Sequence, residues 1–470
     1  MQRSISLCLV TFQRITFKLC DTTDSPMTDF ITNLPSSLAC GVLSTWLEIQ
    51  SLVRLDSAYC KSDKRGCLHD LLRSKECISS ELVILNNTQL LQWIFNRNIQ
   101  VSRICLQGGI DVFVSSQYLL RFGEWIRTVH LFEGCTIDDA YRVVAYCRNL
   151  RSVQFDEKLV TTAFIELLNA NPQLDEVFMY TFDSAFTATL DKYKCPSLKH
   201  LQVKDCLEGP LPWKTFTGFA LEEIVLGNLP WFSVEDATII AEHCPMLRQL
   251  SADDMNVCDR QLNIFATSCK QLTYMSILNN TVVTDKGILQ LIKGLPLLTC
   301  LHIGGCTKLT AQSLKYIRAH AAALVVLSVD IPRNGLSELT TLVKERAHIT
   351  CLELRSVAQD TTAAEAAFAQ MGHIRSLVLE GELVTDAVLC WVAQYCPKLE
   401  RLSLLDEVVS LKKSPLALAK GCPLLKLFVV GSLKYVGVSA LPFLQYLRPQ
   451  LRVVTYDSSD TDKDAFFLPI

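Results

Sequence analysis

One short apolar pattern recurs along this chain and strongly limits what it can fold into. It reads apolar residue, two variable residues, apolar residue, one variable residue, apolar residue, and it occurs fifteen times between Val101-SRICL and Leu451-RVVTY. Successive copies begin 23 to 26 residues apart, with a mean of 25. So short a unit cannot bury its own apolar face, so neighbouring copies must stack into one continuous core.

Each copy predicts one strand followed by one helix. In the pattern itself the apolar residues alternate, which places them on the buried side of a strand and the variable residues on the other side. Apolar residues then recur at i, i+3, i+4 and i+7, as in 286–295 and 387–396, which predicts amphipathic helices. The helices are preceded by residues that commonly cap a helix N-terminus, namely Thr136, Ser233, Thr284, Thr310, Thr362 and Thr385.

This repeat resembles the leucine-rich repeat family, specifically its cysteine-containing subclass. The family has an Asn or Cys eight residues after the first leucine of the pattern, and Cys206, Asn280 and Cys306 occupy that position here. The resemblance covers about residues 101–456 and implies an α/β solenoid with a horseshoe shape, a parallel β-ladder on the concave face and helices on the convex face. Residues 76–100 are interpreted as a degenerate first repeat, so the predicted solenoid spans 76–456.

The twenty cysteines of the chain follow the repeat. Six of them lie three residues before the start of a copy, namely Cys147, Cys195, Cys244, Cys269, Cys396 and Cys422. A residue type fixed to one phase of a repeat indicates a packing role as a small hydrophobic side chain with a weak S–H donor. We therefore expect no disulfides and a reducing compartment. The remaining Cys/His cluster (Cys60, Cys67, His69, Cys77) matches no common zinc signature, so no metal is expected.

Residues 30–75 break the 25-residue period and predict a module of three short helices. A Leu-Pro pair opens it, and apolar residues follow at helical spacing. The pattern L-P-x-x-L-x-x-x-V-L-x-x-W-L followed by S-L-V-R-L-D-x-A resembles an F-box, the module that docks on the Skp-type adaptor of a cullin-RING ubiquitin ligase. The resemblance implies an adaptor contact through Leu34, Pro35, Leu38, Val42, Leu43, Leu47 and Leu52. The alternative interpretation is a helical cap that shields the end of the solenoid.

Composition and charge exclude several classes of protein. Apolar residues make up 49% of the chain and charged residues 20%, which is incompatible with a wholly disordered polypeptide. The net charge of −3 provides no electrostatic footprint for nucleic acid or an anionic membrane. No apolar run reaches the ~20 residues that a transmembrane helix needs. Residues 1–29 are predicted to be a disordered extension and 457–470 a C-terminal tail or cap, and the expected location is the cytoplasm or the nucleus.

No catalytic motif is recognisable in the sequence. It contains no G-x-S-x-G, Walker loop, H-E-x-x-H or G-x-G-x-x-G pattern. His302 is expected on the exposed side of its strand near Cys300, but this Cys/His pair lacks a third group that would orient the histidine. We therefore expect neither enzymatic activity nor a cofactor.

Binding to a protein is the function that the repeat favours. The variable residues of successive strands form columns of small, polar and mixed-charge side chains, which suits a protein partner better than nucleic acid. The predicted concave contact residues are Phe178, Tyr180, Lys204, Asp253, Tyr274, His302, Glu353 and Arg355. The first hypothesis is a substrate-recognition subunit of an SCF-type ubiquitin ligase that binds a Skp-type adaptor, and through it a cullin complex, together with a target protein of unknown identity. The alternative is a leucine-rich repeat scaffold or regulator without ligase association.

Overall fold

A computed structural model provides the coordinates of the chain. It describes residues 34–45, 49–59, 65–74, 77–85, 88–108, 111–132, 134–155, 162–179, 197–204, 213, 220–332, 335–356, 361–381, 383–405, 412–431 and 440–455. The chain divides into two compact units, Met1–Thr189 and Leu190–Ile470. The predicted domain boundary between residues 75 and 76 lies inside the first unit and stays a prediction.

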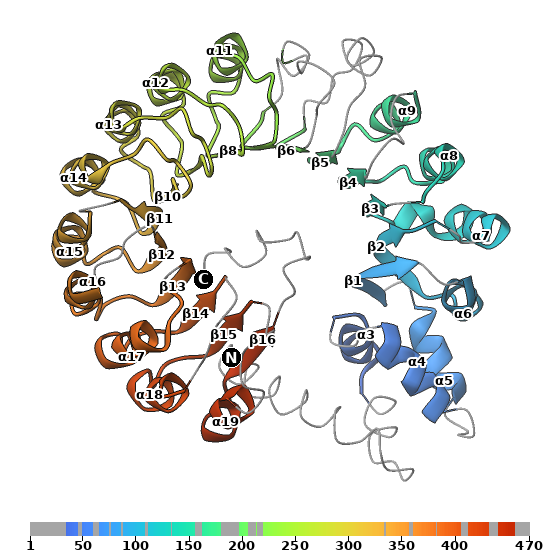
Figure 1. Cartoon of the computed structure of the whole chain (residues 1–470). Helices are drawn as coiled ribbons and strands as arrows, with labels where there is room; N and C mark the ends of the chain where they lie inside the picture. Colours follow the sequence, from blue (N-terminus) through green and yellow to red (C-terminus); the bar gives the residue numbers. More distant parts are fainter. Residues whose placement is uncertain are drawn as a thin grey trace. The chain divides into compact units, whose positions relative to one another are not determined.

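The first unit combines a helical module with the first strand–helix repeats (Figure 1). Three helices form the module: α3 (Ser36–Thr45), α4 (Ile49–Ala58) and α5 (Arg65–Leu72). The repeats that follow contain β1 (Ile78–Leu85), α6 (Thr88–Arg97), β2 (Gln100–Leu106), α7 (Val112–Phe122), the 3₁₀ turn η1 (Gly123–Trp125), β3 (Thr128–Leu131), α8 (Ile137–Tyr146), β4 (Ser152–Phe155), α9 (Thr162–Ala170) and β5 (Glu176–Met179). The strand β1 and helix α6 lie in the segment interpreted as a degenerate first repeat, and that interpretation stays a prediction.

The second unit continues the same alternation. Its first elements are β6 (His200–Lys204), β7 (Glu223–Gly227), α11 (Val234–His243), β8 (Gln249–Asp253), α12 (Asp259–Ser268), β9 (Tyr274–Ser276), α13 (Asp285–Gly294), β10 (Cys300–His302) and α14 (Ala311–His320). The remaining elements are β11 (Val326–Ile331), α15 (Leu336–Glu345), β12 (Cys351–Ser356), α16 (Thr361–Phe368), β13 (Ser376–Gly381), α17 (Asp386–Tyr395), β14 (Arg401–Leu404), α18 (Ser414–Gly421), β15 (Leu427–Val430), α19 (Ala440–Leu447) and β16 (Arg452–Thr455).

Within each unit, every strand pairs in parallel with the strand of the next repeat. The register aligns equivalent positions of the pattern, so that Leu327, Leu352, Leu377, Leu402 and Phe428 lie side by side on β11 to β15. All five side chains are buried. The helices of each unit cover one side of its ladder (Figure 1). Short parallel strands joined by helices at a constant period are a leucine-rich repeat solenoid, so the predicted α/β fold class is confirmed.

Helix caps connect consecutive repeats of the second unit. Thr284 caps α13, and its Oγ1 and backbone N–H also donate to the carboxylate of Asp259, the first residue of α12, at 2.6 and 2.9 Å. Thr310 repeats the arrangement one repeat later with Asp285, at the same two distances. Each acid therefore lies at the positive end of its own helix and also fixes the start of the next one. The predicted caps are confirmed at Thr136, Ser233, Thr284, Thr310 and Thr385.

Thr362 is an exception to the predicted caps. The helix α16 begins at Thr361, so Thr362 lies within the helix and does not precede it. Helix boundaries commonly differ by one or two residues between assignments, which explains a one-residue error of this kind.

Cysteines at a fixed repeat phase pack in the core, as predicted. Of the six cysteines that lie three residues before the start of a copy, five are described, and all five are buried: Cys147, Cys244, Cys269, Cys396 and Cys422. Cys195 lies outside the described residues. Burial raises the pKa of each of these five thiols to about 12. Cys422 Sγ also lies 3.5 Å from the carbonyl oxygen of Cys396, the equivalent residue of the preceding repeat. The thiol thus fills space and donates a weak hydrogen bond between repeats.

Candidate protein-interaction surfaces

The helix α3 separates the predicted adaptor contacts into a buried set and an accessible set. Val42 and Leu43 are buried with Leu52 of α4 in the interior of the helical module. Nearer the start of the helix, Leu34 is half-buried, Pro35 is exposed and Leu38 is 57% exposed. The side chain of Leu47 lies outside the described residues. An adaptor can therefore reach Leu34, Pro35 and Leu38 directly, and the role of all seven residues stays a prediction.

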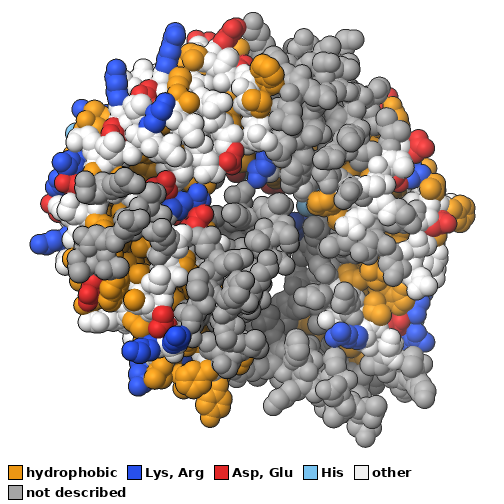
Figure 2. All heavy atoms as spheres, in the orientation of Figure 1, with side chains coloured by type: hydrophobic (Ala, Val, Ile, Leu, Met, Phe, Trp, Pro, Cys, Tyr) orange, Lys and Arg blue, Asp and Glu red, His pale blue; other side chains and the backbone are white. Residues whose placement is uncertain are grey.

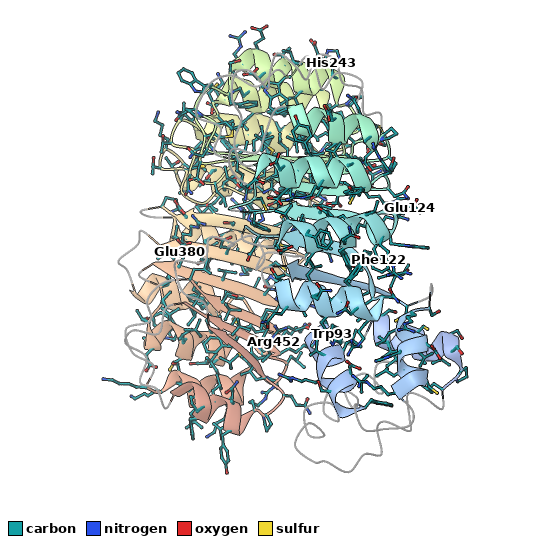
Figure 3. The ribbon with its side chains drawn as sticks, turned by 90° about the vertical axis from the view of Figure 1, so that its right-hand side faces the viewer. Trp93, Phe122, Glu124, His243, Glu380 and Arg452 are labelled. Carbon is teal, nitrogen blue, oxygen red and sulfur yellow. The ribbon has the colours of Figure 1, made fainter. Side chains whose placement is uncertain are left out.

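A buried carboxylate ties this module to the first repeat of the same unit. Asp56 of α4 is 2% exposed, and its oxygens accept hydrogen bonds from Arg65 and His69 of α5, the latter at 2.9 Å. From α6 it receives Arg97 Nη2 at 2.8 Å and Trp93 Nε1 at 3.3 Å. Figure 3 labels Trp93 on α6, beside the module. The four donors join three helices through one side chain, which we call the Asp56 hub.

The Asp56 hub holds its carboxylate ionised. Burial alone raises the pKa of a carboxyl, but the hydrogen bonds from His69, Arg97 and Arg65 outweigh it and lower the pKa of Asp56 to about 2. The sequence contained a signal for this position, because Asp56 lies four residues after Leu52 on the buried side of its helix. A charged residue on an apolar helix face predicts a buried partner, although it does not say which one.

The second unit carries a cluster of charged side chains on its strands, which we call the polar strip. It comprises Asp253, His302, Asp330, Glu353, Arg355 and Glu380, from β8, β10, β11, β12 and β13. Strand register explains why they meet: Ser328 pairs with both His302 and Glu353, and Arg355 pairs with Asp330 and Glu380. Adjacent strands lie about 4.8 Å apart, so side chains two repeats away are within reach across a small serine.

Arg355 and His302 are the cations of the polar strip. Arg355 Nε lies 3.1 Å from Glu353 Oε1 and 2.9 Å from Glu380 Oε2. His302 Nδ1 lies 3.7 Å from Glu353 Oε2, while its Nε2 lies 3.0 Å from Cys300 Sγ. The Tyr274 ring packs against the imidazole, with centroids 5.4 Å apart. Glu353 therefore lies between a guanidinium and an imidazole.

The pKa values of these groups follow from burial and pairing. Burial would lower the pKa of His302, but the contact with Cys300 and the nearby carboxylate of Glu353 outweigh this and raise it to about 10. Burial likewise opposes ionisation of Glu353, yet the nearby imidazole of His302 and the charge of Arg355 lower the pKa of Glu353. At Asp253 and Asp330 burial dominates and raises the pKa of both carboxyls. The strip thus contains a paired centre flanked by less well compensated acids.

Gly304 provides the space that Arg355 crosses. A Cβ atom at Gly304 would lie 3.0 Å from both Cδ and Nε of Arg355. Beyond the glycine, Arg355 Nη1 lies 3.5 Å from Asn279 Oδ1, three repeats away in sequence. The absence of a side chain at Gly304 lets the guanidinium lie across β10 and connect β12 to the turn after β9.

Some of the residues predicted to contact a partner on the concave face lie in or beside the polar strip, and others lie on other strands. Asp253, Tyr274, His302, Glu353 and Arg355 come together on β8 to β12. Lys204 is half-buried at the end of β6, and Phe178 is half-buried on β5 in the first unit. Tyr180 lies outside the described residues. The role of all eight as partner contacts stays a prediction.

Two expectations about His302 were wrong. It was expected on an exposed strand face, but it is only 4% exposed, and its column neighbours Ser276 and Ser328 are fully buried. The physical reason is lateral packing: the Tyr274 ring covers the imidazole, and ion pairing makes burial of the charge tolerable. The Cys300–His302 pair was also expected to lack an orienting third group, whereas Glu353 faces His302 Nδ1.

Other exposed surfaces were missed by sequence analysis. The helix α7 of the first unit exposes Phe113 and Leu120, and α19 of the second unit exposes Phe443 and Tyr446. In the face shown in Figure 2, basic and acidic side chains both occur over the helices of the second unit. Mixed charge with scattered apolar side chains is normal for a protein surface, so these helices do not single out a binding site. Among the described residues, no helix has the length and apolar character needed to cross a bilayer.

Comparison with known proteins gives distant structural similarities. No protein-family model matches the chain. A chain of the yeast Rad7–Elc1 complex is 15% identical over 96% of this chain and 97% of that one, with a TM-score of 0.43. TLR13 in complex with ssRNA13 is 14% identical over 77% and 52%, with a TM-score of 0.43. The leucine-rich repeat-containing protein LegL7 from Legionella pneumophila is 9% identical over 62% and 87%, with a TM-score of 0.35. The fold assignment therefore depends on this chain's own period, strands and register.

Proposed function

We propose that this chain is a non-enzymatic, intracellular protein that links two protein partners, as the substrate-recognition subunit of an SCF-type ubiquitin ligase. In this proposal the exposed side of α3 binds a Skp-type adaptor that connects to a cullin. The polar strip of the second unit binds the target protein. The chain itself does no chemistry; it raises the concentration of the target beside the ubiquitin-transferring enzyme.

The observation that carries the adaptor part is the exposure of Leu38. This leucine is 57% exposed on α3, and Pro35 beside it is exposed as well, while Val42 and Leu43 on the same helix are buried. Ala39 and Cys40 are also fully buried, so the helix already has an apolar face for its own core. Leu38 lies outside this core and is accessible to a partner, which supports an adaptor contact at this end of α3.

The polar strip supports the target-binding part. Its ion pairs are nearly removed from solvent, with Glu353 3% and His302 4% exposed, so their geometry is fixed before a partner arrives. Preorganised charges give specificity by penalising partners that place a like charge opposite them. Burial raises the pKa of Asp253 and Asp330, so a basic side chain of the target placed beside them would favour their ionised forms.

Co-purification with a purified Skp-type adaptor tests the adaptor part. The variant Leu38→Arg places a charge in the proposed contact, and we expect adaptor capture to fall at least about tenfold, as for the loss of an interface hot spot. Leu120→Arg is the matched control, because Leu120 is 62% exposed on α7 of the same unit. It should bind like the wild-type chain. If the wild-type chain captures no adaptor, or if both variants bind equally well, the ligase proposal is wrong.

A scaffold without ligase association is the second candidate, and the Asp56 hub favours it. A helical module bonded to the first repeat through Asp56, Arg65, His69 and Arg97 has the features of a solenoid cap. The full chain and a chain that lacks residues 30–75 are compared to separate the cap from the adaptor-binding module. If the module is only a cap, the full chain binds no adaptor and the deletion abolishes cooperative unfolding of the remaining repeats. If the module binds an adaptor, the full chain captures it.

A further inference from the structure

Three side chains on β10 and β12, two strands that flank β11 in the second unit, lie next to one another in series. Cys300 and His302 lie two residues apart on β10, so both side chains point to the same side of the sheet. Cys300 Sγ is 3.0 Å from His302 Nε2. The other ring nitrogen, Nδ1, is 3.7 Å from Glu353 Oε2 on β12. A thiol, an imidazole and a carboxylate in this order are the arrangement that activates a cysteine as a nucleophile.

We propose that Cys300 is a nucleophilic thiol, activated by His302 and oriented through Glu353, and that it is a site of covalent modification by electrophilic α,β-unsaturated carbonyl compounds. His302 touches the reacting sulfur, while Glu353 is a positioning residue that acts through the imidazole. The proposal concerns modification and not turnover, and it does not depend on the ligase function or on any partner.

The surroundings keep the imidazole in place. His302 is 4% exposed and Glu353 is 3% exposed, and the Tyr274 ring packs against the imidazole. The second oxygen of Glu353 is held by Arg355 at 3.1 Å. Cys300 itself is only partly buried, so the residue is in contact with solvent. The raised pKa of His302, about 10, agrees with an imidazole that readily holds a proton beside Glu353. The ionisable groups that face this cluster are Tyr274, Asp253, Asp330, Cys351, Arg355 and Glu380.

The proposed reaction is an addition that balances without a leaving group. The pair shares one proton between Cys300 Sγ and His302 Nε2. The sulfur attacks the β-carbon of the unsaturated carbonyl compound, an S–C bond forms, and the C=C π electrons move onto the carbonyl as an enolate. The proton then passes from His302 Nε2 to the α-carbon. The net change is addition of S–H across the double bond, with no oxidant or reductant involved.

The chain contains a matched control thiol. Cys351 occupies on β12 the position that Cys300 occupies on β10, and the two flank Val326 of β11 in the ladder register. It is partly buried like Cys300. Two residues later, however, β12 carries Glu353 in place of a histidine, and burial raises the pKa of Cys351. Cys67 on α5 serves as an exposed reference thiol.

The experiment is timed labelling of the native full chain with N-ethylmaleimide, followed by digestion and quantification of the adduct at each cysteine by mass spectrometry. We expect Cys300 to react at least about tenfold faster than Cys351, and faster than the exposed Cys67. In urea the three rates should agree within about twofold, because the arrangement is lost. A native Cys300 rate equal to or below that of Cys351 overturns the proposal.

Variants separate activation from exposure. His302→Gln should lower the Cys300 rate by at least about tenfold and leave the Cys67 rate unchanged. Glu353→Gln should lower the Cys300 rate by a smaller factor, while Glu353→Asp should restore part of it, which a change in folding alone would not do. His200→Gln is the control, because His200 pairs with Glu223 at 2.9 Å on other strands. An unchanged Cys300 rate in folded His302→Gln contradicts the proposal, and the wild-type rates decide it if that variant does not fold.

Discussion

At the scale of single residues, the repeat determines what a side chain does. Asn171 occupies the same phase as the buried cysteines, and its Nδ2 donates to the carbonyl oxygen of Cys147 at 3.0 Å. Cys422 makes the weaker equivalent contact with Cys396. At the turn phase, Asn280 Nδ2 and Cys306 Sγ both donate to a carbonyl of the preceding repeat. Either Asn or Cys can occupy both positions of the repeat, because each has a short side chain with a hydrogen-bond donor.

Replacing Asp56 by Asn tests the Asp56 hub at residue scale. The neutral amide of asparagine cannot balance the positive charges of Arg65 and Arg97. We therefore expect the free energy of unfolding of the first unit to fall by about 2–4 kcal/mol at pH 7. Asp70→Asn is the control, because Asp70 is exposed on α5 and the substitution removes the same charge. Urea denaturation measures both variants. Equal stability of the two would show that the hub contributes nothing.

The same variant has a predicted pH dependence. The pKa of Asp56 is lowered to about 2 in the folded chain, below the ordinary value near 4 of an unfolded aspartate. The stabilisation by the carboxylate is therefore complete above about pH 4 and disappears as the pH falls towards 2. The stability difference between the wild-type chain and Asp56→Asn should shrink over this interval. A difference that is constant from pH 7 to pH 2 would contradict an ionic role for Asp56.

At the scale of elements, helix caps that join one repeat to the next recur in the second unit. Asp259 bonds to Thr284, and Asp285 bonds to Thr310, so each helix start depends on the helix before it. Replacing Asp285 by Ala removes two hydrogen bonds to Thr310, and we expect a loss of about 1 kcal/mol in the free energy of unfolding.

Lys286→Ala provides the comparison for Asp285→Ala, since Lys286 is exposed on the same helix and its side chain takes no part in the cap. Thermal unfolding by circular dichroism is the measurement. Amide hydrogen exchange of Gln312 and Ser313 should also increase, because α14 would begin to fray. If Asp285→Ala and Lys286→Ala unfold at the same temperature, the caps do not couple the repeats.

Elements also show where sequence reasoning succeeded and failed. The strand positions and most caps were predictable, because they repeat with a fixed period and each depends on local spacing. The proximity of His302 and Glu353 could also have been predicted from the sequence. Both lie in one column of the ladder, two repeats apart, with the small Ser328 between them. The contacts of the Asp56 hub were not predictable. Asp56 belongs to the helical module and Arg97, 41 residues later, to the strand–helix repeats, and their contact depends on how the helices pack.

At the scale of the whole molecule, the account assigns different partners to the two compact units. In the proposed function, Leu38 of the first unit, Met1–Thr189, would bind the adaptor, and the polar strip of the second, Leu190–Ile470, would bind the target. Repeat proteins distribute their stability over nearest-neighbour contacts, so a surface substitution in one unit should leave the other folded. Two binding functions that can be removed independently are the central claim.

Quantitative co-purification with three forms of the full chain tests this claim most directly. Wild type, Leu38→Arg and Arg355→Ala are compared for binding to the adaptor and for the set of other proteins retained. Arg355 is chosen because it contacts Glu353 and Glu380 at the centre of the polar strip. We predict that Leu38→Arg loses the adaptor and keeps the other proteins, and that Arg355→Ala does the reverse. Loss of both in either variant while the chain remains folded, or loss of neither, would contradict the account.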